Sequence, residues 1–197
     1  LQQNRLKGRS YFIPYENRKT NRGNIVEVNN STRCHLLNDQ WNFVYYNNIY
    51  EMLDNEKQIY TNKIDVPSVW QFTGYEKPFY INVAYPFPAT PPFVPDCAPG
   101  AIYNRKFTYK KRKDLVRSII TFQGVSAGFD FFINDKYVGY SQGSHYPAEF
   151  DILDYLIDGE NDIKVIVYKW TTGSWFEDQD MFRHNGIFRD VYITDVI

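Results

Sequence analysis

The densest group of residues that could do chemistry is Glu177-Asp178-Gln179-Asp180. Three carboxylates within four residues could bind a hard cation through oxygen, or could accept hydrogen bonds from sugar hydroxyls. The alternative is a solvated loop whose charge is neutralised by Arg183 and Arg189. The aromatic residues in the flanking segments Trp175-Phe176 and Met181-Phe182-Arg183-His184 favour the sugar, because aromatic rings stack on the C–H faces of sugars while the hydroxyls seek acceptors. Catalysis by this loop alone is not expected, since neighbouring acids need not face each other across a glycosidic bond.

The other reactive side chains indicate no site of their own. His35, His145 and His184 lie far apart without metal-ligand spacing. Cys34 and Cys97 could form one disulfide, although two unpaired thiols are the favoured interpretation. With a net charge of −1, a nucleic-acid partner is not expected. No apolar run approaches the roughly 20 residues of a membrane helix, so no membrane partner is expected either.

Composition predicts the scaffold that positions these residues. Val, Ile, Thr, Tyr, Phe and Trp number 77, against 16 Ala, Leu and Met, which excludes a helical bundle and disfavours a doubly wound α/β fold. Alternation and turn signals predict short strands, which indicate an all-β sandwich or jelly roll. The predicted strands are Trp41–Tyr45, Val116–Phe122, Phe129–Ile133, Tyr137–Ser141, Ile163–Trp170 and Val191–Ile197, with turns at Asn134–Lys136 and Gly159–Asp162 and core residues that include Phe131 and Ile166.

The chain divides into an arm and a body. Residues 1–35 are rich in Asn, Arg and Lys and are predicted to form an extended N-terminal arm with an aromatic anchor at Tyr11–Tyr15. Residues 36–197 form the body. Within it, Pro67–Pro99 holds eight of the ten prolines and is predicted to be an ordered loop with short edge pieces, either functional or packed against a neighbour. One short helix is expected within Glu51–Tyr60, and an end at Ile197 fits a cut between domains.

Several stretches together resemble the N-terminal sugar-binding domain of family 2 glycoside hydrolases, specifically the long bacterial β-galactosidases. The resemblance covers residues 37–197. The Asn-Val-x-Tyr-Pro, Pro-Pro-Phe-Val-Pro and Asp-Gln-Asp pieces point to the β-galactosidases rather than the β-glucuronidases. The matching pieces include Leu37–Phe43, Val66–Gln71, Tyr80–Pro86, Pro91–Pro95, Val138–Gln142, Glu177–Arg183 and Gly186–Asp190.

This resemblance implies a jelly-roll β-sandwich that is like a galactose-binding domain. It also implies a downstream immunoglobulin-like domain and a TIM barrel that carries both catalytic glutamates, so no catalytic residue is expected in this chain. Asn82 would hydrogen-bond a galactosyl hydroxyl. Asp180 would contact galactose and coordinate a sodium ion that barrel residues complete. Magnesium is expected only in the barrel.

The implied partners are a galactoside substrate and the chain's own downstream barrel, in a homo-oligomeric enzyme of the bacterial cytoplasm or periplasm. The arm resembles the segment that lies along the barrel. The alternative function is a stand-alone carbohydrate-binding module without a catalytic role. Two positions depart from the family pattern: Asp39 replaces the glycine of Leu-Asn-Gly-x-Trp, so that turn is expected to differ, and Thr172 replaces an aspartate that would join Gln142 in a second magnesium site. That second magnesium is therefore not expected.

Overall fold

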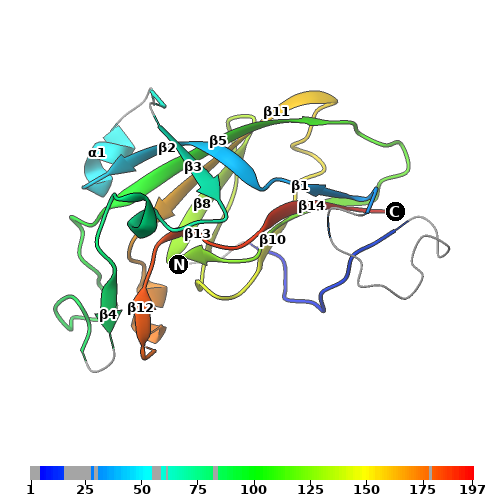
Figure 1. Cartoon of the computed structure of the whole chain (residues 1–197). Helices are drawn as coiled ribbons and strands as arrows, with labels where there is room; N and C mark the ends of the chain where they lie inside the picture. The colour runs from blue at the N-terminus through cyan, green and yellow to red at the C-terminus, as the bar shows by residue number, and fades with distance from the viewer. Residues whose placement is uncertain are drawn as a thin grey trace.

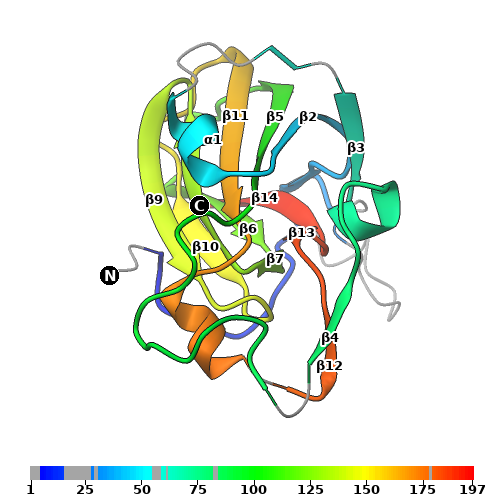
Figure 2. The ribbon, with the colours of Figure 1, turned by 90° about the vertical axis from the view of Figure 1, so that its left-hand side faces the viewer.

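A computed structural model of the chain describes residues 5–15, 28, 31–54, 59–60, 62–81, 84–177 and 179–197. Over these ranges the chain forms two packed antiparallel sheets, so the predicted all-β jelly-roll sandwich is confirmed (Figure 1). The larger sheet has β3 and β9 at its two edges (Figure 2). In spatial order its strands are β3 (Asn62–Val66), β2 (Asp39–Tyr46), β5 (Gly100–Tyr109), β11 (Gly159–Tyr168), β8 (Gly128–Ile133) and β9 (Lys136–Gln142).

The second layer is a four-stranded sheet in which the last strand of the chain lies between two earlier ones. Its order is β1 (Cys34–Leu36), β14 (Val191–Val196), β6 (Arg117–Phe122) and β10 (Ala148–Asp151). Two small ladders join β4 (Phe79–Ile81) to β12 (Met181–Arg183), and β7 (Val125–Ser126) to β13 (Gly186–Ile187). The helical elements are α1 (Ile49–Asp54), η3 (Trp70–Thr73) and η4 (Thr172–Phe176).

The core lies between the two sheets and is rich in aromatic rings. Along β8 the side chains of Phe129, Phe131 and Ile133 are buried, whereas Asp130 and Phe132 between them point to the outer face. This alternation follows from the two-residue period of a strand. Phe131 meets Phe122 of the other sheet at 5.2 Å between ring centroids and Phe150 at 5.4 Å. The aromatic content therefore supplies the packing between the layers.

Most of the predicted strands are confirmed, and one predicted turn is wrong. The turn between β8 and β9 lies where expected, with φ of 51° at Asn134 and 60° at Asp135, the positive pair that a type I′ hairpin requires. The turn predicted at Gly159–Asp162 is instead the start of β11, paired with Lys106–Tyr109. The Asn161 side chain accepts from Ile157 N and donates to Ile157 O, so it closes the loop that precedes the strand.

Strand β5 was not predicted, although it lies between β2 and β11. The polar run Asn104-Arg105-Lys106 hid the alternation, and pairing on both sides overrides the low strand propensity of these residues. The prediction that Ile166 belongs to the core is also wrong. It is half-buried and lies on the outer face, while Val165 and Val167 face the core.

Asp39 occupies the position where the family pattern has glycine, and its backbone keeps a glycine-like conformation. Its φ is 151°, in the region that side chains with a Cβ rarely adopt. The carboxylate accepts from Gln40 N at 2.8 Å and lies 3.8 Å from Arg105 Nη2. The substitution therefore leaves a strained residue at the start of β2.

Both cysteines are free thiols, Cys34 buried and Cys97 exposed. Within the described ranges, no helix is long and apolar enough to cross a membrane.

Candidate functional site

Asp180 lies at the tip of a short two-stranded ladder that leaves the sandwich, named here the β4–β12 extension (residues 79–81 and 181–183; Figure 2). The ladder pairs Met181 with Ile81 and Phe182 with Tyr80. Asp180 precedes Met181 directly and is exposed, and the Tyr80 hydroxyl donates a hydrogen bond to its Oδ1. The extension therefore holds a carboxylate at the surface with a second oxygen to offer.

The second predicted sugar-binding residue, Asn82, lies outside the described residues. In the sequence, Asn82 directly follows Ile81 and Asp180 directly precedes Met181. Ile81 and Met181 are paired in the ladder. Both predicted binding residues thus adjoin one pair of the same ladder.

The other acids of the Glu177–Asp180 group do not share the position of Asp180. Glu177 is half-buried, and its carboxylate accepts from Ser144 N at 2.5 Å and from Ser144 Oγ at 2.7 Å. It therefore fastens the end of η4 to the loop that follows β9. Asp178 lies outside the described residues. Of the acids described in this group, only Asp180 is exposed.

A series of ring contacts runs from Tyr80, which donates to Asp180, across the extension, whereas Trp175 of the flanking pattern packs against Tyr85 and Phe87. Tyr80 and Phe182 meet edge to face at 5.3 Å, and Phe182 stacks on His184 at 6.0 Å between centroids. Phe72 joins them with 75% of its surface exposed and lies 4.9 Å from the His184 ring. Burial lowers the pKa of His184, so this ring is neutral at neutral pH and adds no charge. A carboxylate beside exposed rings is an arrangement that suits a sugar.

A buried polar network holds the root of the extension. The Lys169 ammonium pairs with Glu76 Oε1 and lies 4.7 Å from the centre of the Phe79 ring. Glu76 Oε2 accepts from Trp70 Nε1 at 3.2 Å and from Gln71 Nε2 at 3.1 Å. Burial, followed by the nearby Glu76 charge, raises the pKa of Tyr45 to about 12.

Gln71 links this network to the segment between β12 and β13. Its side chain accepts from Asn185 N at 2.9 Å and donates to Asn185 Oδ1 at 3.0 Å. Sequence reasoning missed Gln71, Glu76, Lys169 and Asn185. The available signal was the position of Gln71 next to an aromatic residue, Trp70, and of Lys169 at the end of an apolar strand, β11.

The described residues contain no cluster of three or more His, Cys, Asp or Glu that could hold a metal ion. Asp180 can offer a hard cation one carboxylate group, so the donor set fits a partial sodium site that needs oxygens from elsewhere. Gln142 is the residue that a second magnesium site would use in the family pattern. Its Oε1 atom accepts from Thr172 Oγ1 and from Gly173 N, each at 3.1 Å.

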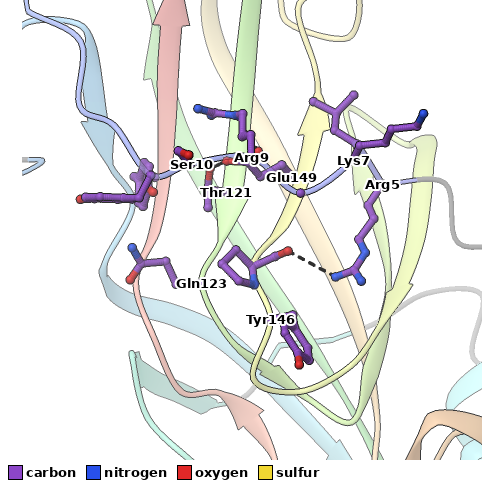
Figure 3. Close-up of a pocket in the computed structure, with 13 residues that line it drawn as sticks. Arg5, Lys7, Arg9, Ser10, Thr121, Gln123, Tyr146 and Glu149 are labelled. Carbon is purple, nitrogen blue, oxygen red and sulfur yellow. Dashed lines mark hydrogen bonds and ion pairs between the residues drawn. The ribbon is translucent and has the colours of Figure 1, made fainter.

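Two cavities lie near these elements. One of 130 Å³ beside β12 is lined by Val69, Ser126, His145, Met181, Phe182, Arg183, His184 and Phe188. A larger one of 630 Å³ lies where arm residues 5–11 cross the four-stranded sheet (Figure 3). There Arg9 Nε pairs with Glu149 Oε2 at 2.8 Å, and Arg5 Nη1 donates to Pro147 O at 3.3 Å. None of its lining residues belongs to the extension.

Comparison with known proteins agrees with the fold and the motifs. The family described as "Glycosyl hydrolases family 2, sugar binding domain" matches residues 34–196. The chain is 40% identical over 190 residues to a β-galactosidase of Staphylococcus xylosus, covering 96% of this chain and 19% of that protein. It is 47% identical over 167 residues to a β-galactosidase of Leuconostoc mesenteroides, covering 81% of this chain and 16% of that protein.

Solved structures show the same fold at lower identity. A Bacteroides uniformis β-glucuronidase matches with a TM-score of 0.59 at 21% identity, over 83% of this chain and 18% of that one. A β-D-mannosidase from Dictyoglomus thermophilum matches with a TM-score of 0.54 at 16% identity, over 82% and 22% of the two chains. The sandwich, the ordered motifs and the family match over residues 34–196 together show that this chain belongs to the sugar-binding domain family of family 2 glycosyl hydrolases.

Proposed function

We propose that this chain forms one wall of the galactose subsite in a retaining β-galactosidase that hydrolyses terminal β-D-galactosides. The relatives named above are β-galactosidases, and the chain spans only 16–19% of their length. That proportion favours a part of a larger enzyme over a stand-alone carbohydrate-binding module. The observation that carries the proposal is the exposed Asp180 carboxylate, held by Tyr80 at the tip of an aromatic extension.

In this proposal the chain binds and orients the sugar and does not cleave it. Asp180 accepts a hydrogen bond from a galactosyl hydroxyl and supplies one ligand to sodium, whose positive charge helps to fix the sugar. Asn82 hydrogen-bonds a second hydroxyl. Retaining hydrolysis requires two carboxyl groups about 5–5.5 Å apart across the bond. Glu177 is already engaged by Ser144, and the proposal places both catalytic carboxyl groups, and any magnesium, in other parts of the enzyme.

The test is Asp180→Asn in the complete polypeptide that contains this chain. The change keeps the side-chain shape and removes the charge. Hydrogen bonds to charged groups contribute about 1.5–3 kcal/mol, so lactose turnover at saturating sodium should fall at least about tenfold. The melting temperature should not change, because Asp180 is exposed. The exposed Asp54→Asn on α1 is the matched control and should keep full turnover. Turnover of Asp180→Asn within about twofold of the parent enzyme would refute the role of Asp180.

Asn82→Ala should raise the KM for lactose and lower kcat/KM while it leaves the unfolding transition in place. A loss of stability larger than the loss of kcat/KM would assign Asn82 to the fold instead. Titration of the 197-residue chain with galactose alone should show no saturable binding, because one wall does not enclose a monosaccharide. Tight binding that Asp180→Asn abolishes would favour the independent module.

A further inference from the structure

A third hollow lies on the outer face of the larger sheet, away from the β4–β12 extension. Its volume is 430 Å³. It spans the strands β8, β9 and β11 at the sheet edge that Figure 2 shows on the side of β9. Its lining residues are Val94, Asp130, Tyr137, Tyr140, Tyr168, Trp170, Thr171 and Thr172.

Strand alternation places a charged residue in this hollow. Asp130 lies between the buried Phe129 and Phe131, so its side chain points to the outer face. The Tyr137 hydroxyl donates to its Oδ1 at 3.0 Å, and the Tyr168 hydroxyl donates to its Oδ2 at 2.6 Å. The carboxylate is thus fixed by phenols from both neighbouring strands, and each oxygen keeps capacity to accept another hydrogen bond.

Gly128, one strand period before Asp130, lets the hollow's side chains approach the sheet closely. A Cβ at Gly128 would lie 2.8 Å from the Thr171 methyl carbon and 3.2 Å from the Tyr140 hydroxyl. A larger residue would push both side chains outward. The Tyr140 hydroxyl in turn donates to Gln142 Oε1 at 3.2 Å, which keeps this ring in place.

The chemistry of the lining selects a class of ligand. Four aromatic rings stand beside hydroxyls and one carboxylate, so the surface offers both stacking faces and hydrogen-bonding groups. No Lys or Arg lines the hollow, and its one formal charge is negative, which disfavours phosphates and acidic sugars. Burial raises the pKa values of Tyr137 and Tyr140 to about 12, so both phenols keep their protons at neutral pH.

We propose that this hollow binds a neutral oligosaccharide, with sugar rings against Tyr137 and Tyr168 and a hydroxyl bonded to Asp130. Its volume falls within the roughly 300–1,000 Å³ of small-molecule sites. None of its lining residues belongs to the extension, so this site is separate from the proposed galactose subsite.

The test is an NMR titration of the 197-residue chain with β-1,4-galactotetraose. Saturable shifts are expected at backbone amides of β8, β9 and β11. Tyr137→Ala should weaken binding about tenfold. Tyr50→Ala is the matched control, because Tyr50 on α1 has the same 49% exposure as Tyr137, and it should bind as the parent does. Asp130→Asn keeps the shape of the site and should also weaken binding about tenfold, because a hydrogen bond to a charged group is lost.

Three outcomes would overturn the proposal. The first is the absence of saturable shifts on β8, β9 and β11, and the second is unchanged affinity in both Tyr137→Ala and Asp130→Asn. The third is displacement of the oligosaccharide from these amides by tetramethylammonium, which would indicate a site for organic cations. Asp180→Asn should leave this titration unchanged, so the galactose subsite and this site can fail independently. If Tyr137→Ala unfolds the chain, as judged by circular dichroism, Asp130→Asn alone decides.

Discussion

The sandwich core and the β4–β12 extension use the same residue types in opposite ways. In the core, Phe122 and Phe131 are fully buried and meet ring to ring across the two sheets. In the extension, Phe79, Tyr80 and Phe182 are 45–56% exposed. The rings Tyr80 and Phe182 contact each other beside Asp180. Aromatic content alone therefore does not distinguish residues that hold the fold from residues available to a ligand. The distinction is whether the strand packs against a second sheet, as β8 does, or leaves the sandwich, as the extension does.

The extension also depends on polar anchoring that the core does not need. Its strands have three residues each, too few for a two-stranded ladder to be stable alone. The buried Lys169–Glu76 pair and the Gln71–Asn185 hydrogen bonds supply the attachment. The predictions below separate the two regions, beginning with the largest expected effect.

Phe131→Ala should have the largest effect on stability. Truncation of a fully buried aromatic ring typically costs about 3–5 kcal/mol of unfolding free energy, because the ring contacts are lost and a cavity remains. Urea denaturation followed by tryptophan fluorescence measures this loss. A loss below about 1 kcal/mol would mean that the two sheets close up around the gap.

Lys169→Met should lower the unfolding free energy by about 3 kcal/mol, because it leaves the Glu76 carboxylate buried without its partner. The matched control is Lys106→Met, which breaks an ion pair with Glu160 that is exposed on both sides. Thermal unfolding should show a lower midpoint for Lys169→Met and no change for Lys106→Met. Equal midpoints for the two variants would remove the anchoring role of Lys169.

Asp195 should make stability depend on pH within the four-stranded sheet. Burial acts to raise its pKa, but hydrogen bonds from His35, Tyr109 and Ser118 outweigh burial and lower the pKa below its ordinary value. A lowered folded-state pKa gives stability that is present above the unfolded pKa of about 3.9 and is lost as the pH falls through the folded value.

Asp195→Asn should therefore lower the unfolding free energy by about 2 kcal/mol at neutral pH. The difference between the two proteins should shrink below about pH 4, as the parent carboxyl takes up its proton. Urea unfolding at a series of pH values measures this. A difference that stays constant on acidification would contradict the assigned hydrogen bonds.

Asp39→Gly should raise the unfolding free energy by about 1 kcal/mol, since glycine adopts the φ of 151° without strain. The gain is reduced by the larger entropy of glycine in the unfolded chain and by loss of the hydrogen bond to Gln40 N. Asp39→Ala is the control and should not stabilise, because alanine keeps the Cβ. A stabilisation by alanine equal to that by glycine would show that the carboxylate, rather than the backbone, is unfavourable.

Phe182→Ala should have the smallest effect on stability, within about 0.5 kcal/mol, because its ring is 51% exposed. In the complete enzyme the same change should lower kcat/KM for lactose, since it removes the ring that packs against Tyr80, the hydrogen-bond partner of Asp180. A stability loss as large as that of Phe131→Ala would remove the distinction between the extension and the core.

The sequence predicts the strands better than it predicts the network that supports the extension. The strand alternation of Phe129–Ile133 and the turn at Asn134-Asp135 are local signals, and both were found where expected. The assignment of Asp180 came from a motif resemblance. The structure shows that Asp180 is exposed next to the β4–β12 ladder, and its role in binding stays a prediction.

The root of the extension could not be predicted because its contacts are long-range. Lys169 and Glu76 are 93 residues apart, and Gln71 and Asn185 are 114 apart. Local patterning gives no register between such distant segments. Glu177 was grouped with Asp180 for the same reason. Its partner, Ser144, lies 33 residues away in the sequence, and this long-range contact is what makes Glu177 an anchoring residue while Asp180 stays exposed.

The position of β14 has a consequence for synthesis of the chain on the ribosome. The strand at residues 191–196 lies between β1, residues 34–36, and β6, residues 117–122, in its sheet. The sheet therefore cannot close until residue 196 has left the exit tunnel. Until then, the nascent chain carries β6, with its apolar Ile119, Ile120 and Phe122, without the neighbour that covers one of its edges. Unpaired apolar edges promote aggregation, so chaperone demand during translation should be greatest in this interval and should end when the last strand is inserted.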